Sequence, residues 1–229
     1  ALAVKQANVD VIAAYPISPQ TPVIEKLSEY IAKGELDCEY LAVESEHSAI
    51  SAAVAASLAG ARVFTSTNSQ GLLLMHEILF VASALRAPLV MSIANRAVSA
   101  PINIWCDHGD VMPQRDTGWI QFFVESVQEL YDRVIQAFRI AGRGDTLLPV
   151  MVNFDGVTLS HTAERVLPLE DGEVSKFTPW KRRQVAIDPR APSTFGAFGY
   201  PDYYYESRVQ AVKALEDSKE AIDEADKKY

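Results

Sequence analysis

VDVIAAYPISPQTPVIEKLSEY, residues 9–30, runs from an apolar segment through a proline-rich turn into an amphipathic segment. The apolar part predicts a buried strand, and the spacing after the turn predicts a helix over about residues 21–33. Two interpretations of the turn are open. Either it ends the strand and starts the helix, with Thr21 as N-cap and Pro22 at the first helical position. Or it presents Ser18 and a helix N-terminus to a ligand, as strand ends of α/β folds often do. Turn chemistry alone favours the first interpretation.

Strand-like and helix-like segments keep alternating up to about residue 156. Short apolar runs predict the strands, and amphipathic or alanine-rich runs predict the helices between them. The expected strands cover residues 9–15, 39–45, 62–68, 88–94 and 149–155, and further helices are expected at 46–60, 71–86 and 125–142. This alternation predicts an α/β fold with a mostly parallel sheet and helices on both faces. Residues 95–118 are expected to be irregular.

The composition changes after the last expected strand, which predicts three parts. Residues 1–163 are expected to form the α/β domain. Residues 164–204 carry many prolines and charges with little periodicity, so a linker or arm is expected there. Residues 205–229 are amphipathic and heavily charged, and their apolar positions are too sparse for a core of their own. This helix is therefore expected to pack on something outside the chain and to lead to a further domain. Its apolar positions are Val209, Val212, Leu215 and Ile222.

Charge and cysteine content exclude several classes of function. The net charge is −9, and no basic stripe with interleaved aromatics occurs, so no nucleic-acid partner is expected. Charges interrupt the longest apolar runs, so no membrane span is expected. Cys38 and Cys106 are isolated from each other, which argues against a disulfide or an iron–sulfur cluster bound by this chain alone. Both are expected to be reduced thiols of a cytoplasmic protein, and neither is expected to bind iron or zinc.

Ligands of open parallel sheets bind beyond the carboxyl ends of the strands, and polar segments follow several of the expected strands there. Glu46 begins the alanine-rich helix, where the helix dipole already favours a carboxylate. The small residues that follow predict a largely buried helix, and a buried glutamate needs a partner, for example a ligand nitrogen. Glu44 is the rival carboxylate, but it is expected to belong to the strand end. Arg96 directly follows a buried strand, a position that suits carboxylate binding, although a surface arginine is the ordinary alternative.

Other kinds of site find little support. Cys106, Asp107, His108 and Asp110 stand close together in CDHGD, but residues adjacent in the chain do not converge as zinc ligands do, so no metal site is expected. Ser69 lacks the glycine two residues earlier that a serine-hydrolase nucleophile turn requires. Neither a phosphate-binding P-loop nor a GxGxxG motif is present.

Five ordered segments together resemble one enzyme family. They are YPISPQTP, ESEHSA, TSTNSQGLLLM, NRAVSAPINIWCDHGD and RDTGWIQ. In this order and spacing they are similar to the α-subunit of 2-oxoacid:ferredoxin oxidoreductases, of which pyruvate:ferredoxin oxidoreductase (pyruvate synthase) is the best-known member. The likeness runs from residue 1 through about residue 161 and continues weakly into the arm.

The resemblance implies that this region is the pyrimidine-binding domain of a thiamine diphosphate enzyme. Glu46 matches the glutamate that hydrogen-bonds the aminopyrimidine ring, where a carboxylate favours the imino tautomer that activates the thiazolium carbon. Arg96 matches the arginine that holds the 2-oxoacid carboxylate. Ser18 stands where pyruvate enzymes usually have threonine, so a hydroxyl remains but a methyl group is lost. This departure leaves room for a bulkier or aryl 2-oxoacid in place of pyruvate.

The resemblance also implies partners. The chain has no GDG…N pattern for Mg²⁺ and no cluster ligands, so Mg²⁺ is expected on another domain or subunit and iron–sulfur clusters on partner subunits. The implied reaction is oxidative decarboxylation of a 2-oxoacid to an acyl-CoA, with coenzyme A and ferredoxin or a similar acceptor, or the reverse synthesis. The alternative is a non-catalytic scaffold on the same fold that only pairs with a partner subunit.

Overall fold

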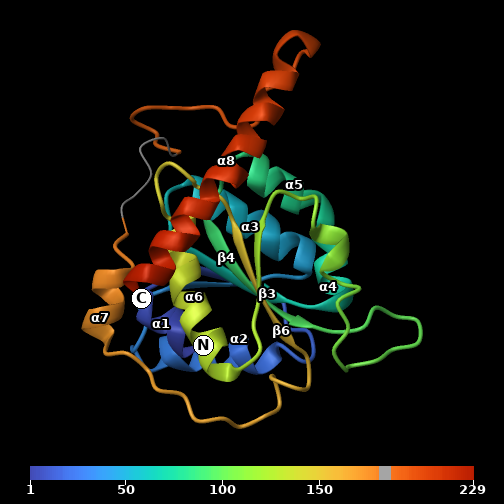
Figure 1. The fold of residues 1–229 in the computed structure, drawn as a ribbon, viewed down its shortest axis with the longest axis vertical. Helices are drawn as coiled ribbons and strands as arrows, with labels where there is room; N and C mark the ends of the chain where they lie inside the picture. The colour runs from blue at the N-terminus through green and yellow to red at the C-terminus, as the bar shows by residue number, and fades with distance from the viewer. Residues whose placement is uncertain (181–186) are drawn as a thin grey trace.

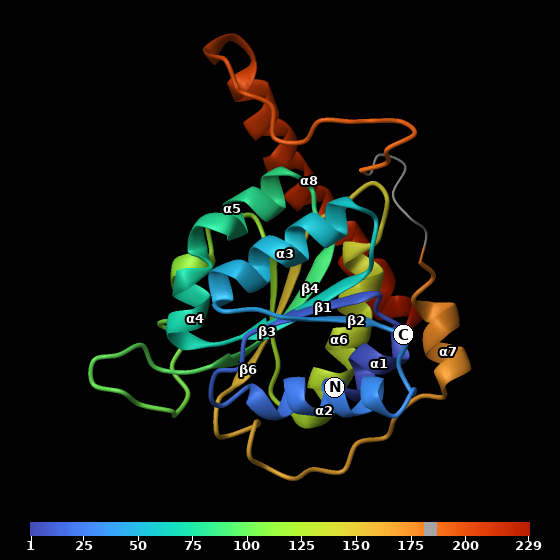
Figure 2. The same ribbon diagram turned by 180° about the vertical axis from the view of Figure 1, so that it is seen from behind.

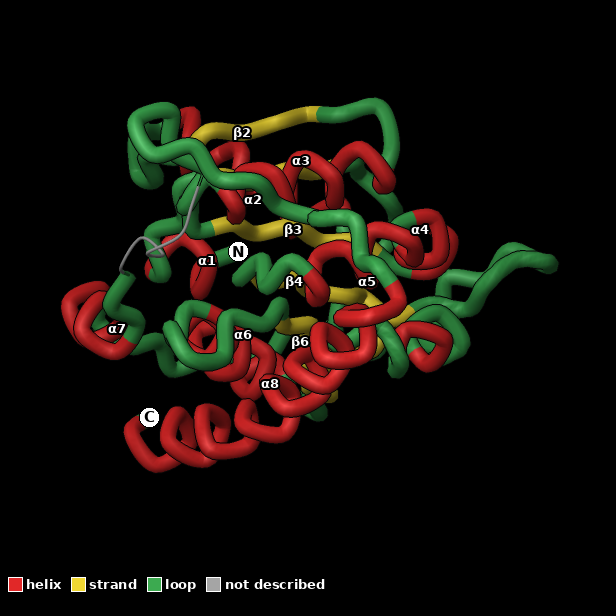
Figure 3. Tube along the Cα trace, turned by 90° about the horizontal axis from the view of Figure 1, so that it is seen from above, coloured by secondary structure: helices red, strands yellow, loops and turns green. Residues whose placement is uncertain are grey.

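Six strands form one all-parallel sheet in the computed structural model, which describes residues 1–180 and 187–229. The strands are β1 (Val11–Ala14), β2 (Glu39–Ala42), β3 (Val63–Thr67), β4 (Leu89–Asn95), β5 (Ile120–Phe123) and β6 (Val150–Asp155). They lie side by side in the order β2-β1-β3-β4-β6-β5, and Figure 3 shows several of them in this order. The predicted α/β fold with a parallel sheet is therefore confirmed.

Helices cover both faces of the sheet, as the sequence predicts. On one face lie α1 (Leu2–Gln6), α2 (Thr21–Ala32) and α6 (Val127–Ala141), and on the other lie α3 (Glu46–Leu58), α4 (Ser69–Leu74) and α5 (His76–Ala84). Figures 1 and 2 show α3 and α5 above the strands and α1 and α2 below them. Successive strand residues point to opposite faces. Phe64 and Val90 therefore pack under the first group of helices, while Val63 and Met91 pack under the second.

Three local predictions differ from the structure. The strand β5 was missed, because it is a four-residue edge strand that pairs only with β6 and is only partly buried. The helix expected over 71–86 begins earlier, at Ser69, and is divided into α4 and α5 at Met75. The N-cap of α2 is Gln20 rather than Thr21. The Gln20 side chain does not cap the helix, since its Nε2 donates to Ser66 O at 2.9 Å and to Tyr15 O at 3.2 Å.

The C-terminal part is more closely joined to the sheet than the sequence predicts. Within the expected arm, α7 (Asp171–Phe177) buries Val174 in the core next to α1 and α6. The last helix, α8 (Pro201–Lys228), extends well beyond the body in Figure 1, but its second half packs on α6. The expectation that this helix packs on something outside the chain is therefore wrong for its second half. The division into residues 1–163, 164–204 and 205–229 itself stays a prediction.

The face of α8 that packs on α6 consists mainly of small residues, and of the four apolar residues noted in the sequence only Ile222 packs against the core. Val209, Val212 and Leu215 are exposed. The buried residues recur at helical spacing, which forms a stripe that lets two helix backbones approach closely. They are Ala214, Ser218, Ala221 and Ala225.

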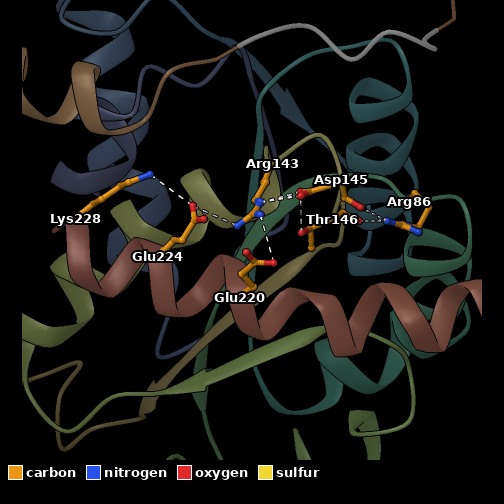
Figure 4. A network of polar contacts seen from close by, with 7 residues as sticks. All are labelled: Arg86, Arg143, Asp145, Thr146, Glu220, Glu224 and Lys228. Carbon is orange, nitrogen blue, oxygen red and sulfur yellow. Dashed lines mark hydrogen bonds and ion pairs between the residues drawn. The ribbon is translucent and has the colours of Figure 1, made fainter.

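Ion pairs at the end of α6 add to this contact. Figure 4 shows Arg143 between Asp145 and two glutamates of α8. Its guanidinium lies 2.8 Å from Asp145 Oδ1, 3.4 Å from Glu224 Oε2 and 3.9 Å from Glu220 Oε2. Partly exposed pairs each contribute only about 0.2–1 kcal/mol, so the small-residue stripe is the larger part of the contact. Among residues 1–180 and 187–229, no helix has the length and apolarity needed to cross a membrane.

Replacing Ala221 by Leu is expected to lower the free energy of unfolding by about 1–3 kcal/mol, because Ala221 is only 3% exposed and the larger side chain would overpack the stripe. Chemical denaturation measures this change. Val212→Leu, on the exposed side of the same helix, is the control and should stay within about 0.5 kcal/mol of the wild type. Equal stabilities of the two variants would contradict the observed packing of α8 on α6.

Candidate active site

The loops that follow β1, β3 and β4 meet at the carboxyl edge of the sheet. The turn after β1 contains Ser18, and its backbone is hydrogen-bonded to the residues that directly follow β3 and β4. Its Ile17 carbonyl accepts from Asn68 Nδ2 at 3.1 Å, and its Ser18 carbonyl accepts from Arg96. The turn thus does more than start α2, because its backbone forms part of this polar edge.

Arg96 is a buried cation at the end of β4, with 6% of its surface exposed. Its guanidinium donates to Ser18 O at 2.6 Å and to Gln70 Oε1 at 2.5 Å, and its Nε has no partner. Both acceptors are neutral, and no carboxylate of the described residues forms an ion pair with it. Burial lowers the pKa of Arg96, and the nearby Asp110 opposes this effect. A buried guanidinium with an unused donor suits an anionic ligand such as a carboxylate.

Asp110 holds this edge together. The residue is fully buried, and its Oδ2 accepts from Ser69 N at 2.9 Å and from Arg96 N at 3.1 Å. Its Oδ1 accepts from Asn95 Nδ2 at 3.0 Å. Burial raises the pKa of the Asp110 carboxyl, while these N–H donors favour the charged form and oppose the rise. The carboxylate therefore fixes the backbone of Arg96 relative to the start of α4.

Glu46 is the first residue of α3, directly after the N-cap Ser45, and is 8% exposed. Its carboxylate has neither a hydrogen bond nor an ion pair to any residue in the described part of the chain. Its rival Glu44 is exposed and accepts from Ser48 Oγ at 2.6 Å, which lowers the pKa of Glu44. A buried carboxylate without a partner is costly. Glu46 is thus the carboxylate that has a hydrogen-bonding position left for a ligand.

The absence of a side chain at Gly71 leaves room for the side chain of Glu46. A Cβ at position 71 would lie 2.7 Å from both Glu46 Cγ and Oε1 and 2.5 Å from Thr67 Oγ1. The Thr67 hydroxyl is also buried and has no partner. Only glycine permits this close approach. Gln70 contacts Arg96 and Gly71 contacts Glu46, so two consecutive residues of α4 join the two predicted site residues.

Ser18 meets Arg96 through its backbone, and its predicted contact with a substrate stays a prediction. Ser18 is exposed, and its carbonyl rather than its hydroxyl accepts a hydrogen bond from Arg96. The hydroxyl has no hydrogen bond to any other residue that the structure describes. Sequence reasoning missed Gln70, Gly71 and Asp110 as site residues. Gln70 and Gly71 stand in the quoted segment TSTNSQGLLLM and Asp110 ends the quoted segment NRAVSAPINIWCDHGD, but their spacing gives no sign of the contacts with Glu46 and Arg96.

Cys106 and His108 converge with Asp155, the last residue of β6. Cys106 Sγ donates to Asp155 Oδ1 at 2.9 Å, and His108 Nε2 lies 3.7 Å from the same oxygen. Burial and the neighbouring Asp155 raise the pKa of the Cys106 thiol to about 12. Asp155 lies 49 positions from Cys106 in the sequence, so the CDHGD segment alone gives no sign of this convergence.

An apolar cavity of about 200 Å³ lies elsewhere, between the sheet and helices α1, α2 and α6. Its lining includes Val4, Phe64 and Val134, and none of the lining side chains is charged. Ser92 and Tyr131 are the polar side chains of an otherwise apolar lining, so the polar edge remains the candidate site.

Comparison with known proteins assigns the chain to a family. The family described as "Pyruvate flavodoxin/ferredoxin oxidoreductase, thiamine diP-bdg" matches residues 2–227. Pyruvate synthase subunit PorA of Methanocaldococcus jannaschii is 53% identical over 228 residues, which are 99% of this chain and 59% of that protein. Ketoisovalerate oxidoreductase subunit VorA of Pyrococcus abyssi is 45% identical over 230 residues, covering all of this chain and 58% of that protein. The chain thus spans somewhat under 60% of the length of these relatives.

Solved structures agree on the fold. The 2-oxoglutarate:ferredoxin oxidoreductase from Magnetococcus marinus superposes with a TM-score of 0.71 at 19% identity, over 95% of this chain and 43% of that chain. The thiamine diphosphate-dependent 4-hydroxybenzoylformate decarboxylase of Rhodococcus jostii RHA1 superposes with a TM-score of 0.57 at 16% identity, over 76% of this chain and 31% of that chain. At these identities the likeness supports the fold alone.

Replacing Gly71 by Ala is expected to lower the free energy of unfolding by about 1–3 kcal/mol, although alanine is the better helix former. The new Cβ would overlap Glu46 and Thr67. Shortening the carboxylate in the double variant Glu46→Asp/Gly71→Ala should recover at least about 0.5 kcal/mol of that loss. Denaturant unfolding of the single and double variants measures this coupling.

Gly144→Ala is the control, because a Cβ there meets nothing within 4 Å. Additive effects of the substitutions at positions 46 and 71 would show that Glu46 does not lie against Gly71.

Proposed function

Because the chain belongs to the pyruvate flavodoxin/ferredoxin oxidoreductase family, through its thiamine diphosphate-binding part, we propose that it binds the pyrimidine half of that cofactor within a 2-oxoacid oxidoreductase. The proposed reaction is oxidative decarboxylation of pyruvate to an acyl-CoA, or the reverse synthesis. Pyruvate is preferred as substrate because pyruvate synthase subunits are the more similar relatives, at 53% identity against 45% for the ketoisovalerate enzyme.

The observation that carries this proposal is the unpartnered, buried carboxylate of Glu46 beside Gly71. The site fits the pyrimidine half of the cofactor, because Glu46 offers an acceptor to a ring N–H and Thr67 offers an unused hydroxyl. Thiamine diphosphate, when bound, supplies the carbon nucleophile and the electron sink for decarboxylation. The contribution of Glu46 is to hold a proton at the pyrimidine, at a position from which water is largely excluded.

Arg96 is proposed to bind the carboxylate of the 2-oxoacid. Its Nε is buried without a partner, and Ser18 O and Gln70 Oε1 hold the other two nitrogens, so the guanidinium is already oriented before a ligand arrives. Asp110 fixes the backbone of this arginine. A preoriented cation lowers the entropic cost of placing the substrate. The Ser18 hydroxyl is proposed to contact the same substrate carboxylate.

The remaining parts of the enzyme are proposed to lie outside this chain. Mg²⁺ would be held by another domain or subunit, iron–sulfur clusters by partner subunits, and coenzyme A and ferredoxin or a similar acceptor would bind to the assembled complex. The relatives are themselves called subunits, which supports an assembly of several chains. We also propose a cytoplasmic location, because Cys38 and Cys106 are free thiols.

Glu46→Gln is expected to lower 2-oxoacid turnover by ~10²–10⁴-fold, because it removes a proton-transfer group while keeping the side-chain shape. Steady-state assays of the assembled complex, with thiamine diphosphate in excess, measure the loss. The exposed Glu44→Gln variant is the matched control and should keep full turnover. Near-normal turnover of Glu46→Gln would contradict the catalytic role and favour a non-catalytic scaffold.

Arg96→Lys is expected to raise the KM for the 2-oxoacid and lower kcat, with cofactor affinity unchanged. Lysine cannot reproduce the planar fork of the guanidinium, and the loss of transition-state stabilisation should be about 2–5 kcal/mol. Ser18→Ala keeps the carbonyl that accepts from Arg96, so its effect should be only about 0.5–1.5 kcal/mol. Kinetics with pyruvate and with a bulkier 2-oxoacid test both variants. Unchanged kinetics of Arg96→Lys for every 2-oxoacid would exclude carboxylate binding.

A further inference from the structure

Three side chains with different donor atoms meet beside the proposed active site, and the proposed function gives them no role. Cys106 and His108 come from the loop after β4, and Asp155 ends β6. Their donor atoms, Sγ, Nε2 and Oδ1, all lie within 4.8 Å of one another. We propose that Cys106, His108 and Asp155 bind a zinc ion and leave its fourth coordination position open to water or a further ligand.

The separations fit a tetrahedral ion. With the usual zinc–sulfur, zinc–nitrogen and zinc–oxygen bond lengths, three ligands of a tetrahedron lie about 3.3–3.6 Å apart. Here Sγ and Oδ1 are 2.9 Å apart, Nε2 and Oδ1 3.7 Å, and Sγ and Nε2 4.0 Å. Each separation needs a change of about 0.7 Å or less to reach that range. In the structure the thiol proton lies between sulfur and oxygen, and on binding the ion takes its place while the proton passes to solvent.

The donor set favours zinc over the other common divalent ions. Mg²⁺ and Ca²⁺ select oxygen ligands almost exclusively, whereas a mixture of sulfur, imidazole nitrogen and carboxylate oxygen suits the borderline-soft Zn²⁺. Three protein ligands with an open fourth position are typical of zinc sites that bind water or substrate. The side chains of His108 and Asp155 are 45% and 38% exposed, so a fourth ligand can reach the ion.

Neighbouring residues already restrain two of the three ligands, His108 and Asp155. The His108 carbonyl accepts from Met112 N at 2.9 Å and from Val111 N at 3.2 Å, and its ring meets Phe123 of β5 edge-on at 5.4 Å. Asp155 is fixed by the β4–β6 ladder, where it pairs with Asn95. Little ordering is therefore required when the ion binds, and this favours affinity.

Element-specific mass spectrometry tests the proposal on the complete chain in its purified complex. The complex is dialysed to equilibrium against chelator-buffered Zn²⁺, and bound zinc is counted per chain, so iron in partner subunits does not interfere. Cys106→Ser and His108→Gln should each remove one zinc per chain at a free Zn²⁺ concentration that saturates the wild type. The loss in affinity should exceed the roughly 10–100-fold that the loss of an outer-shell partner costs.

Two controls keep the test specific. Cys38→Ser removes the other free thiol, and Asp107→Asn removes an exposed carboxylate next to Cys106. Both should retain the zinc. If the wild type and the Cys106 and His108 variants hold equal zinc, the ion is adventitious and the proposal is wrong.

A second measurement needs no variant. Saturating Zn²⁺ should slow alkylation of Cys106 in the wild-type complex by at least about 10-fold, because a metal-bound thiolate reacts slowly, while Cys38 should react at an unchanged rate. Peptide mass spectrometry reports both cysteines in one sample. Equal rates at Cys106 with and without Zn²⁺ would overturn the proposal.

Discussion

The buried carboxylate of Asp110 is the interaction on which the polar edge depends. It accepts from the backbone at Ser69 and at Arg96 and from the side chain of Asn95, so it joins the end of β3, the end of β4 and the loop between β4 and β5. Removing an acceptor of this kind would leave several buried N–H groups unpaired, which costs more than the hydrogen bonds themselves contribute. The negative charge also offsets the buried cation of Arg96 without forming an ion pair with its guanidinium. That guanidinium therefore stays available to a ligand.

The first turn of α4 separates the two charged site residues while holding both. Gln70 accepts from Arg96, and Gly71 lies against Glu46, so consecutive backbone units set the positions of a cation and an anion. No ion pair joins Glu46 and Arg96 within the described ranges. Had they paired, each would neutralise the other and neither could bind a ligand charge. Two opposite charges that are kept apart and largely buried at this edge of the sheet suit ligands that bring a hydrogen-bond donor to one charge and an anionic group to the other.

The sequence predicts the parts of this arrangement that are local. Five of the strands and the main helices follow from hydrophobic period, and Glu46 and Arg96 follow from their places after strands. The strand β5 and the small-residue face of α8 were not predicted. Both are defined by the elements that they pack against, and neither has an apolar pattern of its own that marks it in the sequence. Asp110, Gly71 and the Cys106–His108–Asp155 cluster escaped for a related reason. Their longest contacts join Glu46 with Gly71, Ser69 with Asp110, and Cys106 with Asp155, which are 25, 41 and 49 positions apart, and spacing along the chain carries no signal of these contacts.

The two centres at this edge share one structural element, the end of the β4–β6 ladder. Asn95 holds Asp110 through its side chain, and it pairs in register with Asp155. The carbonyl of Asn95 accepts from Gly156 N at 2.9 Å, and a Cβ at position 156 would lie 2.3 Å from that oxygen. Glycine is therefore required for the close approach of the two strands beyond their ladder. Since Asp155 precedes this glycine and Arg96 follows Asn95, a displacement of either strand end would move the proposed zinc ligand and the proposed substrate-binding arginine together.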